Sequence, residues 1–267
     1  MKNLKIYCVT NKMSKFLEQL PFQLVGVGTE KFSNKYIDCK IKKNIQKKEK
    51  NYSELTFHYW FWKNQLPLLK KNIWIGFCQK RRFWVYDNTN IKNFSDLKKK
   101  LLTNIPKEWE KFESLICNPI DVSNPKKIKV LKRGIKNLIK DPSILFIKNK
   151  QSIKLHFDMH HGYGVLDKAI DFMNNNDKDE FRYFVNNHSI FNPHIMCISK
   201  KDILNKWFKD LFTWLFKCER VFGIKNLKGY DQQRLYAYLA ERYLPFWFKK
   251  YTKYREQNWI FFDVINE

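Results

Sequence analysis

Short apolar runs in the first half of the chain alternate with segments in which apolar positions recur at helical spacing. Residues 51–63 (NYSELTFHYWFWK) have the periodicity of an amphipathic helix, with Asn51 or Ser53 as its N-cap. Strands that alternate with helices are typical of a parallel α/β sheet. The predicted strands of this half are 4–10 (LKIYCVT), 22–27 (FQLVGV), 72–78 (NIWIGFC) and 114–122 (SLICNPIDV), the last including a turn.

The second half is predicted to be more helical and to be built on the same sheet. A basic helix within 126–150 should end at Asp141–Pro142, because proline cannot continue a helix. The remaining predicted elements are helices at 166–173, 202–222 and 230–248 (interrupted near Pro245), a loop at 174–178, and a turn into a buried strand at 191–199.

Residues 153–160 alternate between apolar and polar positions, which predicts a strand. On that strand, His156, Asp158 and His160 would share one face, and His161 with a Gly-Tyr-Gly turn would follow at its end. Two imidazoles and a carboxylate at this spacing could bind a divalent metal such as Mn²⁺ or Mg²⁺, or supply a base near a phosphate. The alternative is a polar strand edge with hydrogen-bonded histidines.

Basic residues follow directly after the buried strand 72–78, in the order Gln79-Lys80-Arg81-Arg82. In open α/β sheets, ligands bind beyond the carboxyl ends of the strands. Arg81 and Arg82 could therefore hold a diphosphate, because each guanidinium offers a planar fork of donors. The alternative is a solvated run of charges.

A third group lies on the predicted helix GYDQQRLYAYLAER. We expect one face of it to carry Asp231, Arg234, Tyr238 and either Glu241 or Arg242, as binding groups or as a surface ladder of ion pairs. Glu54 and His58 form an i,i+4 pair on the aromatic helix 51–63. The alternative is that the negative charge of Glu54 only interacts favourably with the dipole at the start of the helix.

Composition narrows the functional class. The 267 residues carry a formal charge of +25, mainly from lysines spread along the chain. Such a charge attracts nucleic acid, an anionic membrane surface or an anionic nucleotide-sugar. We do not favour nucleic acid, because abundant Lys and Asn are also typical of an AT-rich genome and the chain has no helix-turn-helix or zinc-finger signature.

No apolar run reaches the length of a membrane-spanning helix, and the N-terminus has no signal-peptide core. The six cysteines are widely spaced in apolar surroundings and suggest buried thiols in a reducing compartment. We therefore expect a cytoplasmic protein, with peripheral contact at the inner face of the plasma membrane as an option.

Several sequence blocks resemble a bacterial glycosyltransferase family that was long catalogued as a domain of unknown function and is found in capsule and lipopolysaccharide gene clusters. The paired blocks NYSELTFHYWFWKN and WIGFCQKRRFW resemble its ELTxxYWxWKN and YIGxCxxRR motifs. The resemblance continues, in the family's order, through HFDMHHGYGVLDKAI, FNPHIMCISK, WLFKCERVFG and GYDQQRLYAYLAER, and covers most of residues 5–250.

The resemblance implies a Rossmann-like, A-type glycosyltransferase fold in one domain, with residues 1–125 binding the nucleotide-sugar and 126–267 binding the acceptor. It implies transfer of a hexose, heptose or galactofuranose from a UDP- or GDP-linked donor to a capsular polysaccharide, O-antigen or lipid-linked acceptor. We expect inversion, because the sequence shows no dedicated nucleophile. Where many A-type enzymes carry an Asp-x-Asp metal motif, this chain has Cys78-Gln79-Lys80-Arg81-Arg82.

Roles follow for individual residues. Asp158 is the first choice of base and Asp231 the second, while Glu54 would orient sugar hydroxyls. The donor diphosphate would be held by Arg81, Arg82, His160, His161 and His194, and the acceptor by Arg234 and Glu241. Two other classes stay open: a basic nucleic-acid-binding protein, which explains the charge, and a non-catalytic carbohydrate-binding protein, which explains the aromatic content.

Overall fold

The computed structural model describes residues 3–123, 125, 127–147, 150–225 and 227–263. The chain divides into two compact units. Unit 1 comprises Met1–Asn118, His194–Lys209 and Phe248–Glu267, and unit 2 comprises Pro119–Pro193 and Asp210–Trp247. The prediction of one domain with halves meeting near residue 125 is not tested by this division and stays a prediction.

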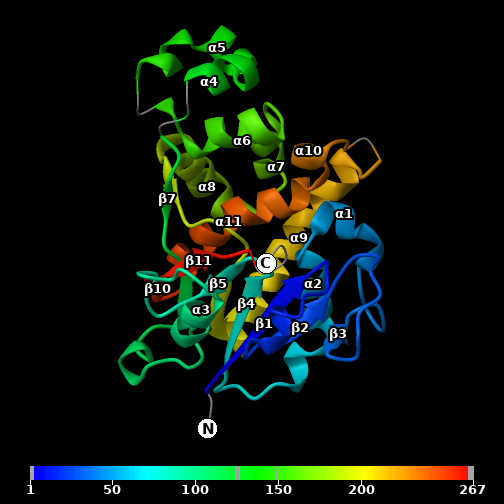
Figure 1. The fold of residues 1–267 in the computed structure, drawn as a ribbon. Coiled ribbons are helices and arrows are strands. Elements are labelled where there is room, and N and C mark those ends of the chain that lie inside the picture. The colour runs from blue at the N-terminus through cyan, green and yellow to red at the C-terminus, as the bar shows by residue number, and fades with distance from the viewer. Residues whose placement is uncertain (1–2, 124, 126, 148–149, 226, 264–267) are drawn as a thin grey trace. The chain divides into compact units, whose positions relative to one another are not determined.

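Unit 1 is built on a mostly parallel sheet (Figure 1). The central path runs β10-β6-β9-β4-β1-β2-β3, and β5 with β11 continues from β4 as an antiparallel extension. Within the path only β9 runs against its neighbours, β4 and β6. The strands are β1 Leu4–Thr10, β2 Gln23–Gly26, β3 Tyr36–Asp38, β4 Trp74–Gln79, β5 Arg82–Trp84, β6 Ser114–Cys117, β9 Cys197–Lys200, β10 Tyr254–Gln257 and β11 Trp259–Phe261.

The centre of this sheet is closely packed. All six residues of β4 are buried, as its continuous apolar run predicts. A Cβ added at Gly76 would lie 2.9 Å from Ile198 Cγ1 and 3.0 Å from Ile6 Cγ1, so glycine allows the neighbouring side chains to close over the strand. On one face, Phe57 and Phe61 of α2 (Leu55–Asn64) pack on Tyr7 of β1 with ring centroids 5.5 and 4.9 Å away.

The predicted helix 51–63 is divided at Ser53. This residue has a φ of +48°, and it separates α1 (Glu49–Tyr52) from α2, whose N-cap is Glu54 without a capping hydrogen bond from its side chain. The prediction that Asn51 or Ser53 caps the helix is therefore wrong. The other helices of unit 1 are α3 Phe94–Lys100 and the short 3₁₀ turns η1 Leu17–Gln19, η2 Gln46–Lys48, η3 Leu66–Leu68 and η4 Lys107–Trp109.

Unit 2 is mainly helical, which confirms the predicted contrast between the halves. Two long helices, α9 Lys201–Phe222 and α11 Leu235–Tyr251, begin in one unit and end in the other. The remaining elements are α4 Lys127–Arg133, α5 Ile135–Lys140, η5 Pro142–Leu145, α6 Ile153–His161, α7 Val165–Ile170, α8 Asn175–Asn187, α10 Tyr230–Gln233 and the strand pair β7 Ile120–Asp121 with β8 Ile190–Phe191.

The predicted strand at 153–160 is wrong, because these residues form the helix α6. Ser152 caps it, its Oγ accepting from the backbone N–H of Leu155 at 3.3 Å. Lys154 and Asp158 then form an i,i+4 ion pair at 2.7 Å. The apolar residues of this segment are buried in the helix because α6 is covered on more than one side.

Two further predictions of local structure fail in the second half. The segment 174–178, predicted as a loop, holds the N-terminal turn of α8. Pro245 lies inside α11 and does not interrupt it. The predicted architecture nevertheless holds: a mostly parallel sheet flanked by helices, with helical segments added in the second half. None of the helices in the described part of the chain is long and apolar enough to cross a membrane.

Candidate functional site

The carboxyl ends of β1 and β4 lie side by side at one edge of the unit 1 sheet, because the two strands are parallel and paired. Just beyond them, Lys80 Nζ donates to Asn11 Oδ1 at 2.6 Å. The loop after β2 reaches the same place: Gly28, at a φ of +85°, lies next to Asn11 and Glu49. This edge therefore joins loops from three neighbouring parallel strands, which is where open α/β sheets bind ligands.

Arg81 and Arg82 lie in a tight hairpin at this edge. Lys80 and Arg81 form the turn, since Gln79 pairs with Arg82 across β4 and β5. Arg82 Nη1 donates to Gln79 Oε1 at 3.1 Å, and Arg81 Nη1 lies 3.4 Å from Asp263 Oδ2. Both guanidinium carbons lie within 6 Å of the Phe261 ring, at 5.8 and 5.7 Å.

The two guanidinium groups keep unused donors. The Nε atoms of Arg81 and Arg82 are buried and have no hydrogen-bond partner among the residues that the structure describes. Arginine donors that are buried without a partner favour an anion, since a charge-assisted bond would satisfy them. The sequence prediction of neighbouring arginines beyond β4 is thus matched by geometry, while their role as ligands stays a prediction.

His194 packs on the strands that adjoin this hairpin. Its ring meets the Trp259 ring edge-on at 4.4 Å, and its φ of +69° is unusual for a residue with a side chain. Trp259 of β11 pairs with Trp84 of β5, two residues after Arg82. The structure therefore brings His194 to the same extension of the sheet as the arginines.

Glu54 lies at the start of α2. The helix connects β3 to β4, two strands of the parallel sheet, so it begins on the side where those strands end. Its predicted partner His58 lies instead in the aromatic core, 4.4 Å from the Phe77 ring, where burial lowers its pKa to about 3. Glu54 alone of this pair remains a candidate for contact with substrate.

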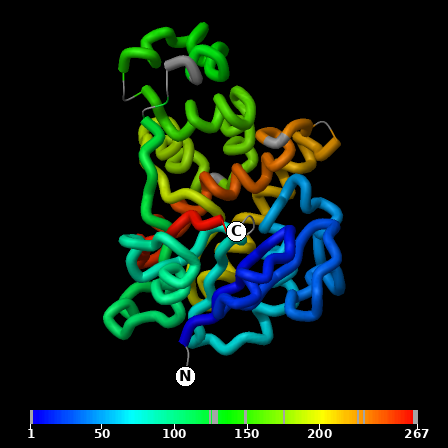
Figure 2. The backbone as a smooth tube through the Cα atoms, viewed as in Figure 1, coloured from blue at the N-terminus to red at the C-terminus, as the bar shows by residue number. Residues whose placement is uncertain are grey.

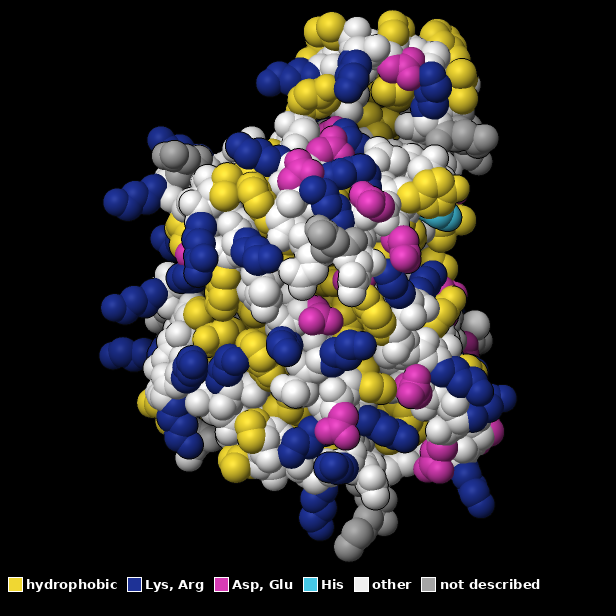
Figure 3. Space-filling view, turned by 180° about the vertical axis from the view of Figure 1, so that it is seen from behind, with side chains coloured by type: hydrophobic (Ala, Val, Ile, Leu, Met, Phe, Trp, Pro, Cys, Tyr) yellow, Lys and Arg dark blue, Asp and Glu magenta, His cyan; other side chains and the backbone are white. Residues whose placement is uncertain are grey.

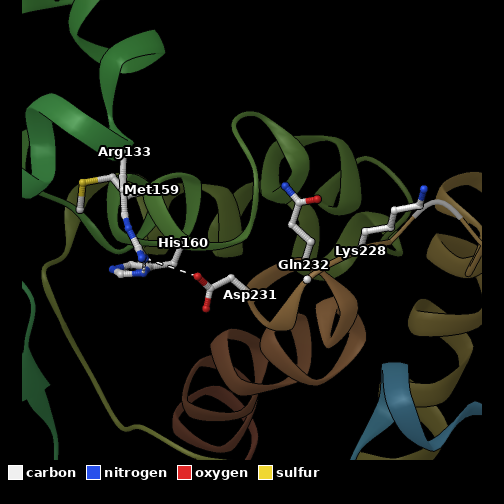
Figure 4. A pocket seen from close by; sticks show the side chains of 7 residues that line it. Arg133, Met159, His160, Lys228, Asp231 and Gln232 are labelled. Atoms are coloured by element: carbon white, nitrogen blue, oxygen red, sulfur yellow. Dashed lines mark hydrogen bonds and ion pairs between the residues drawn. The ribbon is translucent and has the colours of Figure 1, made fainter.

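In unit 2, Arg133, His160 and Asp231 meet at a cavity of about 450 Å³ (Figure 4). Arg133 Nη1 lies 2.9 Å from His160 Nδ1 and 3.4 Å from Asp231 Oδ2. Met159, Lys228, Gly229 and Gln232 complete its lining. Arg133 was not singled out from the sequence, where it is one of many basic residues.

His161 and His156 are held as neutral imidazoles. Burial, with a smaller effect of Arg242, lowers the pKa of His161 to about 4 and that of His156 to about 3. His161 stacks on Tyr238 at 3.7 Å and its Nδ1 lies 2.9 Å from the Asp231 carbonyl oxygen, while His156 Nδ1 lies 3.1 Å from Arg242 Nη2. Neutral rings with these contacts are poor partners for a diphosphate.

Asp158 is enclosed by its own hydrogen bonds. Its side chain is fully buried, Oδ2 accepts from Asn137 Nδ2 at 2.9 Å and Lys154 Nζ at 2.7 Å, and Oδ1 accepts from Gly164 N at 3.1 Å. A base must be within reach of the hydroxyl that it deprotonates. This geometry fits a structural carboxylate, and it gives no support to Asp158 as the base.

The predicted metal set does not form. On a helix, His156 and His160 share a face, whereas Asp158 points toward Asn137 and Lys154. Across the described ranges, no group of three or more His, Cys, Asp or Glu side chains is placed to hold a metal ion. The set was predicted from strand alternation, and the helix removes its basis.

Arg234 and Glu241 do not share one continuous helical face with Asp231. Arg234 is the C-cap of α10, and α11 starts at the next residue. Glu241 lies on α11, where its Oε2 accepts from Nη1 of the buried Arg242 at 2.6 Å. The predicted single face is therefore wrong, and neither residue lines the cavity around Asp231.

A second cavity of about 980 Å³ lies among α5, α6 and α8 of unit 2. Its lining is polar, with amide side chains, the partly exposed Tyr163 ring and four cationic side chains. These cations are Lys140, Lys150, Lys154 and Arg182. Asp141 and Asp167 also line the cavity and pair with Lys150 and Lys154, so the lining suits a ligand rich in hydroxyl groups.

Comparisons with known proteins agree with the fold. The family model "Domain of unknown function (DUF4422)" matches residues 5–253. The apo structure of WbbM, described as a bifunctional glycosyltransferase, superposes with a TM-score of 0.57 at 18% identity, over 97% of this chain and 45% of that chain. The chain thus spans under half the length of that protein. No curated protein matches. At this identity the likeness shows the fold, which is the predicted Rossmann-like fold of a glycosyltransferase.

Proposed function

Since the chain belongs to the DUF4422 family, we propose that it is a glycosyltransferase, which moves a sugar from a nucleoside-diphosphate donor to a hydroxyl of a glycan or lipid-linked acceptor. The observation that carries the proposal is the glycosyltransferase fold over 97% of the chain, with an arginine hairpin at the ligand-binding edge of its sheet. The sequence blocks support a product in capsular polysaccharide or O-antigen, and a UDP- or GDP-linked donor.

The donor diphosphate is proposed to bind at the carboxyl edge of the unit 1 sheet. Departure of the diphosphate leaves positive charge on the anomeric carbon and increases negative charge on the leaving group. Arg81 and Arg82 can stabilise that charge through their guanidinium groups, with Lys80 beside them. Glu54, at the same edge, is proposed to orient hydroxyls of the donor sugar.

A divalent cation does not fit the residues that directly follow β4. Mn²⁺ and Mg²⁺ prefer carboxylate and carbonyl oxygens. The residues after the central strand β4 are instead Lys80, Arg81 and Arg82, and the carboxylate nearest to Arg81, that of Asp263, already pairs with it. We therefore assign charge neutralisation at the diphosphate to the arginines and derive no step through a metal.

For the acceptor, Asp231 is the better of the two predicted bases. Its side chain is about half exposed at a cavity, whereas that of Asp158 is closed off. A carboxylate that removes the hydroxyl proton while the donor diphosphate leaves gives inversion, which is the outcome that we propose. Arg234 and Glu241 are proposed to contact the acceptor.

Thermal shift with a panel of UDP, GDP, CMP, dTDP and ADP tests the proposal, because a ligand that binds only the native state raises the melting temperature. We expect one nucleotide to raise it, with no requirement for Mn²⁺. Arg81→Gln and Arg82→Gln should each weaken binding on the order of tenfold or more, since a hydrogen bond to a charged group contributes about 1.5–3 kcal/mol. Arg220→Gln, at an exposed arginine of α9, is the matched control.

The same panel includes a generic oligonucleotide. A large shift with the oligonucleotide and none with any nucleotide would refute the transferase and support nucleic-acid binding. Sugar affinity that needs no nucleotide would instead support a non-catalytic carbohydrate-binding protein. If a nucleotide binds, release of that free nucleotide from the matching nucleotide-sugar in the presence of acceptor glycans tests transfer, and Asp231→Asn should abolish it while nucleotide binding persists.

A further inference from the structure

A row of exposed apolar side chains on α4 and α5 has no part in the proposed transfer reaction. Leu131, near the end of α4, and Ile135 and Ile139 of α5 are 50%, 58% and 78% exposed, and the four-residue spacing of Ile135 and Ile139 places these two on one side of α5. Phe146 and Ile147, just after η5, are 79% and 45% exposed. Single exposed apolar residues are ordinary, but a contiguous group marks an interaction surface.

The opposite side of this segment already packs against its own core. Val130 and Ile144 are buried with Leu155 and Met159 of α6 in one apolar cluster. Gly134 also faces α6, since an added Cβ would lie in van der Waals contact with Met159 Cγ, at 3.4 Å. The exposed row is therefore a second apolar face, which contributes nothing to the folding of the segment on α6.

Basic side chains accompany the apolar row. Residues 126–140 (KKIKVLKRGIKNLIK) contain seven basic residues and no acidic residue. Lys132, Lys136 and Lys140 are exposed beside the apolar positions. The next acidic residue, Asp141, is neutralised by Lys150 at 2.6 Å. Figure 3 shows hydrophobic and basic side chains gathered together at the top of the view, where Figure 1 places α4 and α5.

We propose that α4, α5 and the turn after η5 form a docking surface for a membrane that contains anionic phospholipids. The apolar row would enter the boundary between headgroups and acyl chains, and the lysines would extend toward the lipid phosphates. A soluble polyanion, whether glycan or nucleic acid, accounts for the lysines but leaves Ile139 and Phe146 in water. The combination of both features favours a lipid surface.

This proposal is independent of the proposed transferase activity, because its residues lie outside the arginine hairpin and do not line the cavity around Asp231. Its first test is co-sedimentation of the full-length chain with vesicles. Binding should be strong to vesicles of phosphatidylcholine mixed with phosphatidylglycerol, weak to phosphatidylcholine alone, and reduced by salt. The triple variant K132Q/K136Q/K140Q should bind the anionic vesicles on the order of 100-fold more weakly, at roughly fivefold per lysine near an anionic surface.

The apolar row is tested separately with I135S/I139S/F146S, which should also lower binding but leave its salt dependence in place. These side chains are exposed, so the melting temperature should hardly change. Leu68→Ser is the matched control, because Leu68 is 74% exposed in unit 1, outside the proposed surface. A melting temperature equal to that of the unmodified chain shows that any loss of vesicle binding is not loss of the fold.

Insertion can be observed directly. All six native cysteines are buried, so Ile139→Cys introduces one accessible thiol for an environment-sensitive dye. We expect a blue shift of its emission with anionic vesicles, and none for the same dye on Leu68→Cys. The proposal is refuted if the dye at residue 139 does not respond, or if the serine variant binds vesicles normally. A change from dimer to monomer in that variant, with unaltered vesicle binding, would assign the surface to a second copy of the chain.

Discussion

His161 should make the protein sensitive to mild acid. Its imidazole is buried, stacked on Tyr238 and within hydrogen-bond distance of the Asp231 carbonyl, and burial lowers its pKa from 6.5 to about 4. Because the folded-state pKa lies below that of the unfolded chain, the unfolded chain takes up the proton first as the pH falls. The stability is therefore complete above about pH 6.5 and is lost progressively down to about pH 4.

The size of the effect follows from the two pKa values. Between pH 7 and pH 5, a histidine whose pKa changes from 6.5 in the unfolded chain to about 4 in the folded chain reduces the free energy of unfolding by about 2 kcal/mol. This is a large part of the roughly 5–15 kcal/mol that stabilises an ordinary protein. His156 adds an effect of the same sign, since its pKa is lowered to about 3.

Urea denaturation at pH 7 and pH 5 measures the loss. His161→Gln keeps an amide that can donate to the Asp231 carbonyl but cannot titrate, so the variant should lose about 2 kcal/mol less than the unmodified chain between the two pH values. The change in stability between the two pH values is compared for each protein, because loss of the stacking on Tyr238 lowers the stability of His161→Gln at both pH values. His188→Gln, at an exposed histidine, is the matched control for loss of an imidazole. An equal loss in His161→Gln and the unmodified chain would refute the assignment.

Three further predictions concern stability. Asp158→Asn should lower the free energy of unfolding by about 2–3 kcal/mol. This is less than the roughly 3–5 kcal/mol usual for a broken buried ion pair, because Lys154 still has Asp167 as an ion-pair partner at 3.2 Å. Urea denaturation, with Asp167→Asn as the control, measures the change. Ser53→Gly should raise stability by about 1 kcal/mol, since a φ of +48° strains any residue with a side chain, and an unchanged melting temperature would contradict the strain. Gly76→Ala should lower the free energy of unfolding by about 1–3 kcal/mol, because the added methyl group overlaps side chains of both neighbouring strands. An unchanged stability in calorimetry would contradict the close packing.

The first half of the fold was predictable because its strands are short apolar runs with clear ends. The bounds of the predicted strand 72–78 lie within two residues of those of β4. The position of Arg81 and Arg82 followed from the rule that loops after parallel strands meet at one edge of the sheet. Residues 153–160 failed because apolar residues at every second position also satisfy i,i+4 spacing. Ser152, which caps α6, was the local signal for a helix.

The arrangement around Asp231 could not be found from the sequence. Arg133 and Asp231 lie 98 residues apart and meet only through the packing of separate helices. The predicted partners of Asp231 were chosen from its own segment, where the break at Arg234 invalidates the helical spacing. The position of His194 against Trp259 also could not be predicted, because it depends on β11, a strand near the C-terminus that the pattern of residues had not indicated.

The place of β9 in the sheet bears on how the chain can fold during synthesis. Strand β6 pairs only with β9 and β10 in the part of the chain that the structure describes, and both follow the first segment of unit 2, Pro119–Pro193, in the sequence. A nascent chain that has emerged through residue 193 can form the ladder β3-β2-β1-β4, but the open side of β4 and both sides of β6 still await partners (Figure 2). Unpaired edges of this kind favour association with other chains. Until β9 emerges, the ribosome-bound intermediate should therefore bind chaperones strongly, and fragments that end before residue 197 should aggregate.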